Sequence, residues 1–383
     1  MKTYRHSLIF GLSYALDIAG KNNLSHSKST AYLSVMIGRK IGLDAEMIFD
    51  LYNAALLHDI GLSNTYDIEQ HCIDGEIMLK ELPLPECIAK DVYYHHENYD
   101  GSGVFGLLGD SIPIGAQIIS FASTFDDLFG KLSDGYDRNL YMTVCGWLDT
   151  NRDLFSDVIV DAFINLMKCE YFLLDYFSLE TIHALSDKIV ACDNVCYDND
   201  DVLKYANCFA NIIDCRSPFT FSHSCGIAEL ARKAVSHLGY GDETQNIMYI
   251  AGLLHDIGKL HVSVDILHKK DKLTHDERFE INKHTYYTRK ILEQISGFED
   301  IVNCAANHHE RINGTGYPYH MLGNRLSRLD KIMAICDVYQ ALTEERPYRD
   351  KLPPDRVWGI IDDMANNNHL DKALASKVSR IFG

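Results

Sequence analysis

The stretch Leu253-Leu254-His255-Asp256-Ile257-Gly258-Lys259 ends an apolar helical pattern with a histidine–aspartate pair, followed by a glycine and a lysine. Neighbouring side chains on a helix point in different directions, so these two metal-binding groups cannot duplicate each other. An imidazole nitrogen binds one ion, whereas a carboxylate has two oxygens and can bridge two ions. The pair therefore predicts a metal site with partner ligands elsewhere in the chain.

The second half of the chain supplies such partners. They are His223, His284, His308, His309 and Asp337. Mixed nitrogen and oxygen ligands suit a two-metal site in which Asp256 bridges the ions. Such a site fits phosphoester hydrolysis, because two ions about 3.5–4 Å apart can activate water and clamp a phosphate. The sequence has no serine elbow or Cys–His dyad that would demand a protein nucleophile, and Gly314-Thr315-Gly316 lacks the GK[ST] of a phosphate-binding P-loop.

An internal repeat relates the two halves of the chain. The interval from His26 to His58 equals that from His223 to His255. Likewise, the His71-to-His95 interval equals the interval from His284 to His308, and a second histidine and a glutamate follow in both halves. The second half carries an extra stretch, about Val262 to Arg278, in which Thr274 to Glu277 resemble a capping box. We therefore predict two related domains.

Few prolines, long amphipathic periods and short polar breaks predict an all-α protein. Helices are expected over residues 7–19, from His26 to about Ile41, and over Leu179–Val190, with Gly42 as a C-cap and Asp44 as the next N-cap. Residues 136–168 and 355–382 are expected to close the two domains. The predicted organisation is a domain at 1–168, a connector at 169–200 and a second domain at 201–383.

Composition narrows the class of protein. The 383 residues are 46% apolar and 23% charged, which is typical of a globular protein, and no apolar run reaches the length of a membrane span. We predict a cytoplasmic protein that does not act at a membrane. The net charge of −18 argues against a surface for nucleic-acid polymers. Without a signal peptide, the 11 cysteines are interpreted as reduced and mostly buried.

The second half, from about residue 205 to 355, resembles the HD-GYP phosphodiesterases of the all-helical HD superfamily of metal-dependent phosphohydrolases. Four motifs carry the resemblance: His255-Asp256-Ile257-Gly258-Lys259, His308-His309-Glu310-Arg311, Gly314-Thr315-Gly316-Tyr317-Pro318, and the segment from Asp337 to Thr343 followed by Arg346-Pro347-Tyr348-Arg349. The resemblance implies hydrolysis of a cyclic dinucleotide by a metal-bridging hydroxide. The first expectation is cyclic di-GMP, cut to pGpG or GMP.

The resemblance also implies roles for individual residues. One ion would bind His223, His255, Asp256 and Asp337, and the second would share Asp256 and bind His284, His308 and His309. Lys259 would neutralise the scissile phosphate or assist the leaving oxygen, Tyr317 would line the substrate pocket, and Arg346 and Arg349 would contact phosphate. Phe219 stands where three-metal members place a glutamate, so two ions are expected in this half. The resemblance implies iron or manganese, while the mixed ligands by themselves also suit nickel, cobalt or zinc.

The first half resembles the same family in a degraded form. It keeps a set of potential vestigial metal ligands: His26, His58, Asp59, His71, His95 and His96. Leu62 replaces Lys259, Ser123 aligns with Asp337, and nothing replaces the arginines. Asp126 and Asp127 lie a turn later and could restore a ligand, but they are interpreted as solvated carboxylates on a helix surface. Hydrolysis is not expected in this half, which would serve regulation, packing or dimerisation.

Three alternatives stay open at this point. The substrate could be 3′,3′-cyclic GMP-AMP (cGAMP) or a linear nucleotide in place of cyclic di-GMP. The protein could instead be a sensor that binds a cyclic dinucleotide or a metal without turnover, although a pure sensor has no need for Lys259 beside a full ligand set. A homodimer is also open, because the apolar residues of 154–174 fit either a dimer interface or the core.

Overall fold

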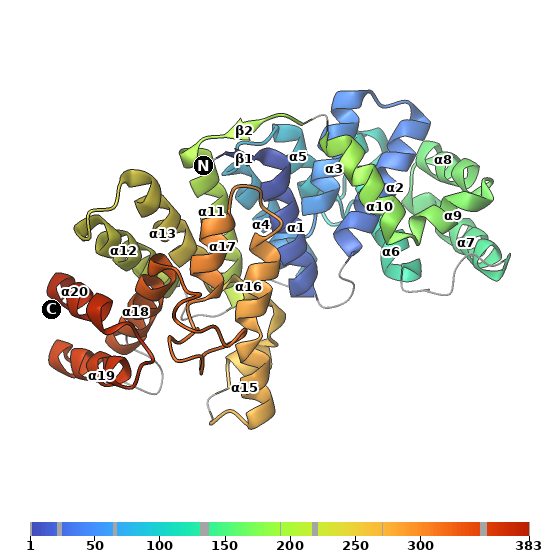
Figure 1. Cartoon of the computed structure of the whole chain (residues 1–383). Coiled ribbons are helices and arrows are strands. Elements are labelled where there is room, and N and C mark those ends of the chain that lie inside the picture. The colour runs from blue at the N-terminus through green and yellow to red at the C-terminus, as the bar shows by residue number, and fades with distance from the viewer. Residues whose placement is uncertain are drawn as a thin grey trace. The chain divides into compact units, whose positions relative to one another are not determined.

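The computed structural model describes residues 2–20, 25–63, 67–130, 138–191, 193–216, 221–269, 271–344 and 351–382 (Figure 1). For residues 138, 139, 170, 214–216 and 221–223 it describes the backbone without the side chains. The predicted all-α class is confirmed: in these ranges the only strands are the short antiparallel pair β1 (Thr3–Tyr4) and β2 (Cys196–Tyr197). Every helix in the described part of the chain is too short or too polar to span a bilayer.

The chain divides into two compact units. One, here called the N-unit, comprises Leu12–Val195, and the other, the C-unit, comprises Met1–Gly11 together with Cys196–Gly383. The first residues of the chain thus pack with its second half, whereas the sequence had placed them in a domain at 1–168. The internal boundary at Val195 lies at the end of the predicted connector, 169–200.

Helices of the N-unit follow the predicted repeat. They are the end of α1 (Arg5–Gly20), α2 (His26–Ile41), α3 (Ala45–Leu57), the 3₁₀ turn η1 (Ile60–Ser63), α4 (Ile68–Lys80), α5 (Glu86–Tyr94), η2 (Gly109–Ser111), α6 (Ile114–Phe129), α7 (Arg138–Asn151), η3 (Arg152–Leu154), α8 (Asp157–Met167), α9 (Glu170–Tyr176) and α10 (Leu179–Val190). The predicted helices at His26–Ile41 and Leu179–Val190 are confirmed at both ends.

The C-unit repeats the same order with an insertion. It contains α11 (Asn199–Arg216), α12 (Phe221–His237), α13 (Asp242–Leu254), η4 (Ile257–His261), α14 (Val264–Leu267), α15 (His275–Asn282), α16 (His284–Leu292), α17 (Glu299–Ala306), α18 (Arg328–Thr343), α19 (Pro354–Asn366) and α20 (Lys372–Phe382). The extra stretch predicted between Val262 and Arg278 contains α14 and the start of α15. The predicted capping box is confirmed, because the Thr274 hydroxyl accepts from the Glu277 N–H while the Glu277 carboxylate accepts from the Thr274 N–H.

Local sequence signals set the helix ends. Gly42 ends α2 with φ 88°, a left-handed conformation that glycine adopts without steric cost, and its N–H donates to the Arg39 carbonyl. The Asp44 carboxylate then accepts from the Met47 N–H at 2.9 Å and begins α3. Both predicted caps are therefore confirmed, and α3 is aimed so that His58 follows its last turn.

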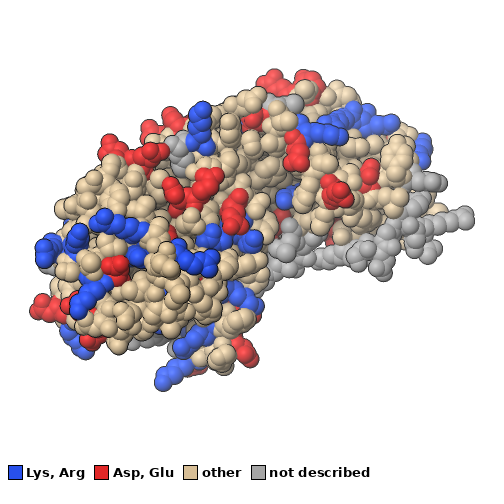
Figure 2. Space-filling model, in the orientation of Figure 1, with Lys and Arg blue, Asp and Glu red and all other residues tan. Residues whose placement is uncertain are grey.

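Most apolar residues of 154–174 belong to the core of the N-unit. Ile159, Phe163 and Leu173 are buried, so core packing accounts for these side chains. Val158 and Tyr171 are exposed, and a role for them in a dimer stays a prediction. On the face of the molecule drawn in Figure 2, the described Lys and Arg side chains are interspersed with Asp and Glu instead of forming one continuous basic surface.

Candidate metal centre

The HD pair lies where α13 gives way to η4. The Nδ1–H of His255 donates to the Gly252 carbonyl at 2.7 Å, which turns the other ring nitrogen, Nε2, toward Asp256. The glycine of the motif lets η4 approach α16, because a Cβ on Gly258 would lie 1.8 Å from the His284 carbonyl oxygen. The Thr288 hydroxyl reinforces this contact by accepting from the Gly258 N–H and donating to the His255 carbonyl.

His284 and His308 are oriented in the same way. Their Nδ1–H groups donate to the carbonyls of Ile281 and Ala305 at 2.7 and 2.6 Å, a tautomer assigned from these partners. Each neutral ring then offers a lone pair on Nε2, and the two Nε2 atoms face each other at 3.3 Å. Two facing lone pairs repel unless a cation joins them, so this arrangement fits a metal ion.

Burial keeps these histidines in the form that binds metal. It lowers the pKa of His284 to about 3 and that of His308 to about 4, and it holds the pKa of His309 well below its ordinary value. Metal ligation requires neutral imidazole, and a buried ring that is already neutral loses no proton when an ion binds.

The Asp256 carboxylate is placed so that it could bridge two metal ions. Its side chain is 4% exposed, and its two oxygens face different rings: Oδ2 lies 3.2 Å from Nε2 of His255, and Oδ1 lies 3.4 Å from Nε2 of His284. Burial disfavours the carboxylate, yet the charges of His255 and Lys259 keep the pKa of Asp256 well below its usual range. The same pairing raises the pKa of His255 against the effect of burial, so a proton on His255 would be displaced by an ion.

Lys259 pairs with Asp256 in this structure. Its Nζ lies 2.5 Å from Oδ2 of the carboxylate and donates to it. The ammonium group therefore balances charge at the oxygen that an ion would use. Its predicted role on the phosphate stays a prediction.

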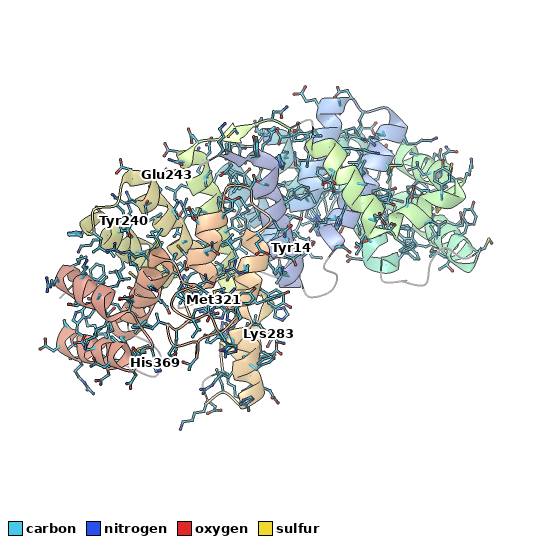
Figure 3. All side chains as sticks on the ribbon, viewed as in Figure 1. Tyr14, Tyr240, Glu243, Lys283, Met321 and His369 are labelled. Carbon is cyan, nitrogen blue, oxygen red and sulfur yellow. The ribbon has the colours of Figure 1, made fainter. Side chains whose placement is uncertain are left out.

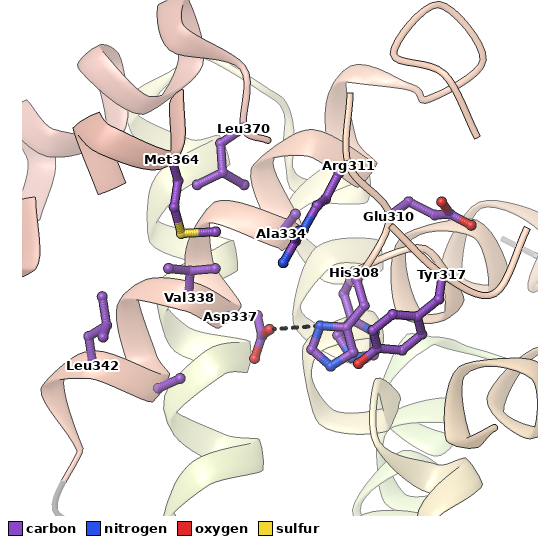
Figure 4. Close-up of a pocket in the computed structure, with 12 residues that line it drawn as sticks. His308, Glu310, Arg311, Tyr317, Ala334, Asp337, Val338, Leu342, Met364 and Leu370 are labelled. Atoms are coloured by element: carbon purple, nitrogen blue, oxygen red, sulfur yellow. Dashed lines mark ion pairs between the residues drawn. The ribbon is translucent and has the colours of Figure 1, made fainter. Parts of the chain in front are cut away.

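Asp337 and Tyr317 complete the described site on its open side. Asp337, on α18, places Oδ2 3.5 Å from Nδ1 of His309, as the dashed line in Figure 4 marks. The Tyr317 ring stacks obliquely on His309 with centroids 4.9 Å apart. These side chains open into a pocket of about 500 Å³. Its remaining lining is His308, Glu310, Arg311, Ala334, Val338, Ala341, Leu342, Met364 and Leu370.

Glu310 fixes the loop that carries Tyr317. Its carboxylate accepts from the N–H groups of Tyr319 at 2.7 Å and Met321 at 2.9 Å, and Figure 3 shows Met321 on the loop before α18. Gly316 must lack a side chain, since a Cβ there would lie 2.3 Å from the Arg311 backbone nitrogen. The Asn313 side-chain oxygen accepts from the Thr315 N–H and hydroxyl and closes an Asx turn.

The structure thus brings together most of the predicted site residues of the C-unit. Atoms of His255, Asp256 and His308 lie within 4.8 Å of one another, and so do atoms of His284, His308 and His309. Four predictions fall outside the description: the side chain of His223 and the residues Phe219, Arg346 and Arg349.

Sequence reasoning assigned no role to Arg311. In Figure 4 its guanidinium group points into the pocket, between the histidines and an apolar wall that includes Met364 and Leu370. Its position directly after the His308-His309-Glu310 motif is the sequence feature that could have identified it as a site residue.

The N-unit has the same framework. Nδ1–H groups of His58 and His95 donate to the carbonyls of Ala55 and Val92 at 2.8 and 2.5 Å. A Cβ on Gly61 would lie 2.0 Å from the His71 carbonyl oxygen, the counterpart of the contact at Gly258. In the same way as Glu310, the Glu97 carboxylate accepts two N–H groups from the following loop, those of Phe105 and Leu107.

One prediction for the N-unit is wrong. Asp126 is not a solvated surface carboxylate: it is 2% exposed and accepts from Nδ1 of His26 at 2.6 Å and from the Tyr176 hydroxyl. Burial disfavours a charged His26, but the hydrogen bond to Asp126 raises the pKa of that ring to about 9. The neighbouring Asp127 is 74% exposed, as predicted.

Comparisons with known proteins agree with this geometry. The family model described as HD domain matches residues 17–143 and 207–374, one match in each half. A 3′3′-cGAMP-specific phosphodiesterase 1 from Vibrio cholerae is 28% identical over 97% of this chain and 90% of its own length, and a phosphodiesterase 3 of the same specificity and organism is 29% identical over 77% of this chain and 63% of its own. A cyclic di-GMP phosphodiesterase from Pseudomonas aeruginosa is 34% identical over 45% of this chain and 41% of its own length.

A solved structure supports the fold over the whole chain. The crystal structure of a cyclic GMP-AMP-specific phosphodiesterase of V. cholerae matches with a TM-score of 0.74 at 22% identity, covering 100% of this chain and 98% of that one. The predicted resemblance is therefore confirmed: the chain belongs to the HD domain family, as a member of the HD-GYP type.

Proposed function

We propose that the protein is a metal-dependent phosphodiesterase that hydrolyses a cyclic dinucleotide at the C-unit, with 3′,3′-cGAMP preferred over cyclic di-GMP. The observation that carries the activity is the convergence of His255, Asp256, His284 and His308, the last of which lines a pocket together with Tyr317 and Arg311. Facing imidazole lone pairs and a two-oxygen carboxylate are the donor set that divalent ions require.

The choice of substrate rests on the relatives. Two relatives that align over 97% and 77% of this chain, at 28% and 29% identity, are named as specific for 3′3′-cGAMP. A cyclic di-GMP phosphodiesterase of V. cholerae aligns over 74% at the lower identity of 24%, and the cyclic di-GMP enzyme of P. aeruginosa aligns over 45%. We therefore place cGAMP before cyclic di-GMP and reverse the order expected from the sequence.

Two divalent ions, bound by these residues with His309, Asp337 and His223, would lower the pKa of water and offset charge on the phosphoryl oxygens. Iron or manganese is the proposed metal. The protein positions the substrate: Lys259, freed from Asp256, would neutralise the scissile phosphate or the leaving oxygen. Arg311 would hold an anionic group of the substrate in its guanidinium fork, together with Arg346 and Arg349.

The apolar wall of the pocket would receive a base. Val338, Leu342 and Met364 lie opposite the histidines, and such surfaces stack on the faces of nucleobases without reading their edges. The N-unit has Leu62 in place of Lys259, so we propose that it does not hydrolyse substrate and that domain 1–168 is regulatory or structural.

The test uses the full chain, purified without oxygen and loaded with manganese or iron. It is incubated with 3′,3′-cGAMP and with cyclic di-GMP, and the nucleotides are separated by chromatography. We expect faster hydrolysis of cGAMP, loss of product in His308→Ala, and retention of product in His95→Ala. Binding of either nucleotide without product under all metal loadings would instead favour a sensor, and equal or faster turnover of cyclic di-GMP would overturn the proposed preference.

A further inference from the structure

The N-unit keeps a cluster of two histidines and an aspartate at the position that corresponds to the metal centre of the C-unit. Nε2 of His26 faces Nε2 of His58 at 3.3 Å, and the oxygens of Asp59 lie 3.7 and 3.4 Å from these two atoms. Ligand atoms of these three residues all lie within 4.8 Å of one another. The site opens into a pocket of about 310 Å³ inside the N-unit.

Asp126 determines which nitrogen of His26 faces the cluster. The carboxylate accepts from Nδ1–H at 2.6 Å, so Nε2 is the nitrogen that faces the cluster. The Ala55 carbonyl accepts from Nδ1–H of His58 and turns Nε2 of that ring toward the same point. A divalent ion placed there would displace the proton on Nε2 of His26 and bind both nitrogens.

A second residue restrains Asp126 on the side away from His26. Tyr176, at the end of α9, is 2% exposed, and its hydroxyl donates to the second oxygen of Asp126. A carboxylate that accepts from a ligand histidine while a third group restrains it is the usual support for a metal-bound imidazole. Because Ser123 stands where the C-unit has Asp337, Asp126 restores a carboxylate to this side of the N-unit site.

The acidic lining of the pocket disfavours phosphates. Its lining contains the carboxylates of Asp17, Asp59, Asp126 and Asp127, and no Lys or Arg occurs among the described residues that line it. In the C-unit, Lys259 and Arg311 lie at the corresponding centre. An anionic nucleotide would therefore meet like charge in the N-unit, whereas a divalent cation would meet opposite charge.

We propose that the N-unit binds one divalent cation through His26, His58 and Asp59, that Asp126, backed by Tyr176, is the positioning residue for His26, and that this centre takes no nucleotide. These residues are separate from the proposed active site of the C-unit. The proposal for the N-unit can therefore be wrong while the proposed function is right.

The test measures metal content in the full chain. A His255→Ala/Asp256→Ala background removes the bridging ligand of the C-unit, and the protein is equilibrated with manganese, iron(II) or cobalt(II) and analysed by mass spectrometry. We expect about one equivalent of ion to remain bound and to be lost when His58→Ala is added. Asp126→Asn should weaken the metal affinity about 10- to 100-fold, as loss of such a supporting carboxylate does elsewhere.

Two controls distinguish a positioning role of Asp126 from a purely structural one. Asp153→Asn, which removes an exposed carboxylate of the same unit, should leave the metal affinity unchanged. The cobalt(II) absorption spectrum should shift in Asp126→Asn, even if the thermal midpoint of the metal-free protein does not. Absence of bound ion in the background, or unchanged metal affinity and spectrum in Asp126→Asn, would overturn the proposal. Binding of cGAMP that disappears with His58→Ala would overturn the exclusion of nucleotide.

Discussion

Lys259 is proposed to serve two anions in turn. Its ammonium group donates to Asp256, the carboxylate expected to bridge the ions. Once ions neutralise that carboxylate, the ammonium becomes available to a phosphate on the same side. We predict that Lys259→Met lowers kcat for cGAMP about 100-fold with unchanged metal content, because a preorganised donor to developing charge is lost.

The control for this change is Lys290→Met, which removes a lysine that pairs with Glu293 on α16. It should leave kcat unchanged. If Lys259 serves only to balance Asp256, Lys259→Met will instead tighten metal binding without lowering kcat.

Arg311 is the second residue whose role the structure adds. Among the described residues its guanidinium group forms no ion pair, although it lies inside the pocket of a strongly acidic chain. We predict that Arg311→Met raises KM for cGAMP about 10- to 100-fold, the effect of losing one hydrogen bond to a charged group. Arg311→Lys should recover part of the loss, and Arg325→Met, an exposed arginine of the same unit, should have no effect. An unchanged KM in Arg311→Met would remove this residue from the binding site.

Asp91 gives a prediction about pH. Burial raises the pKa of this carboxyl to about 7, although the Ala116 N–H at the start of α6 opposes the shift. The folded state therefore holds a proton that the unfolded chain releases near pH 4, and the stability from this proton is lost as pH rises from about 4 to about 7.

Asp91→Asn keeps the acceptor oxygen and removes the ionisation. We expect the variant to be more stable than the parent at pH 8, by up to about 4 kcal/mol, and equal to it at pH 4. Thermal unfolding of both proteins between pH 4 and 8 measures this difference. Parallel curves across that range would contradict the assignment.

Residue roles were predictable wherever a motif defines them locally. The placement of His255, Asp256, His284 and His308 follows from spacing on helices whose ends carry clear signals. The burial of Asp126 was not predictable, because it depends on Tyr176 from α9, far along the chain. The orientation of Arg311 depends on the loop that Glu310 fixes, and helical periodicity does not reach that loop.

At the scale of elements, the contact between η4 and α16 positions the HD pair against His284. A Cβ at Gly258 would lie 1.8 Å from the His284 carbonyl and 2.5 Å from the Thr288 backbone nitrogen, and backbone atoms cannot move aside singly. We predict that Gly258→Ala lowers the free energy of unfolding by about 2–4 kcal/mol and abolishes metal binding in the C-unit.

Gly359→Ala is the matched control. Gly359 lies within α19, and a Cβ there meets nothing within 4 Å, so alanine should stabilise the helix by about 0.5–1 kcal/mol. Denaturant unfolding and metal analysis of both variants test the pair. Normal metal content in Gly258→Ala would show that the metal site does not depend on the close contact between η4 and α16.

Helices and caps were the most predictable elements. His26–Ile41, Gly42, Asp44 and the capping box at Thr274 all depend on residues within one or two turns. The pairing of β1 with β2 was not anticipated, since it joins residues from opposite ends of the repeat and each strand has two residues.

At the scale of the whole chain, the repeat was visible in equal intervals between histidines, and the family match falls in both halves. Substrate preference was not visible. It depends on how a base meets the wall of a pocket built from α18, α19 and the loop carrying Arg311, and no local pattern encodes that surface.

The first residues of the chain belong to the C-unit, so a fragment that lacks them loses part of that unit's core. Thr3 pairs with Tyr197, the Ser296 hydroxyl donates to Ser7, and Leu8 and Ile9 are fully buried. Burial of each of these two apolar side chains contributes about 1.5–3 kcal/mol. We therefore predict that the proposed domain 201–383, expressed alone, unfolds at a lower temperature than the C-unit of the full chain.

A peptide of residues 2–20, added in excess, should restore part of the lost stability, because it binds only the folded fragment. The same peptide with Leu8 and Ile9 replaced by alanine should not. Calorimetry of the fragment with each peptide, at fixed metal loading, distinguishes them. A fragment that melts with the full chain and ignores both peptides would mean that residues 201–383 complete their core without the N-terminus, and the boundary predicted from the sequence would then describe an independent domain.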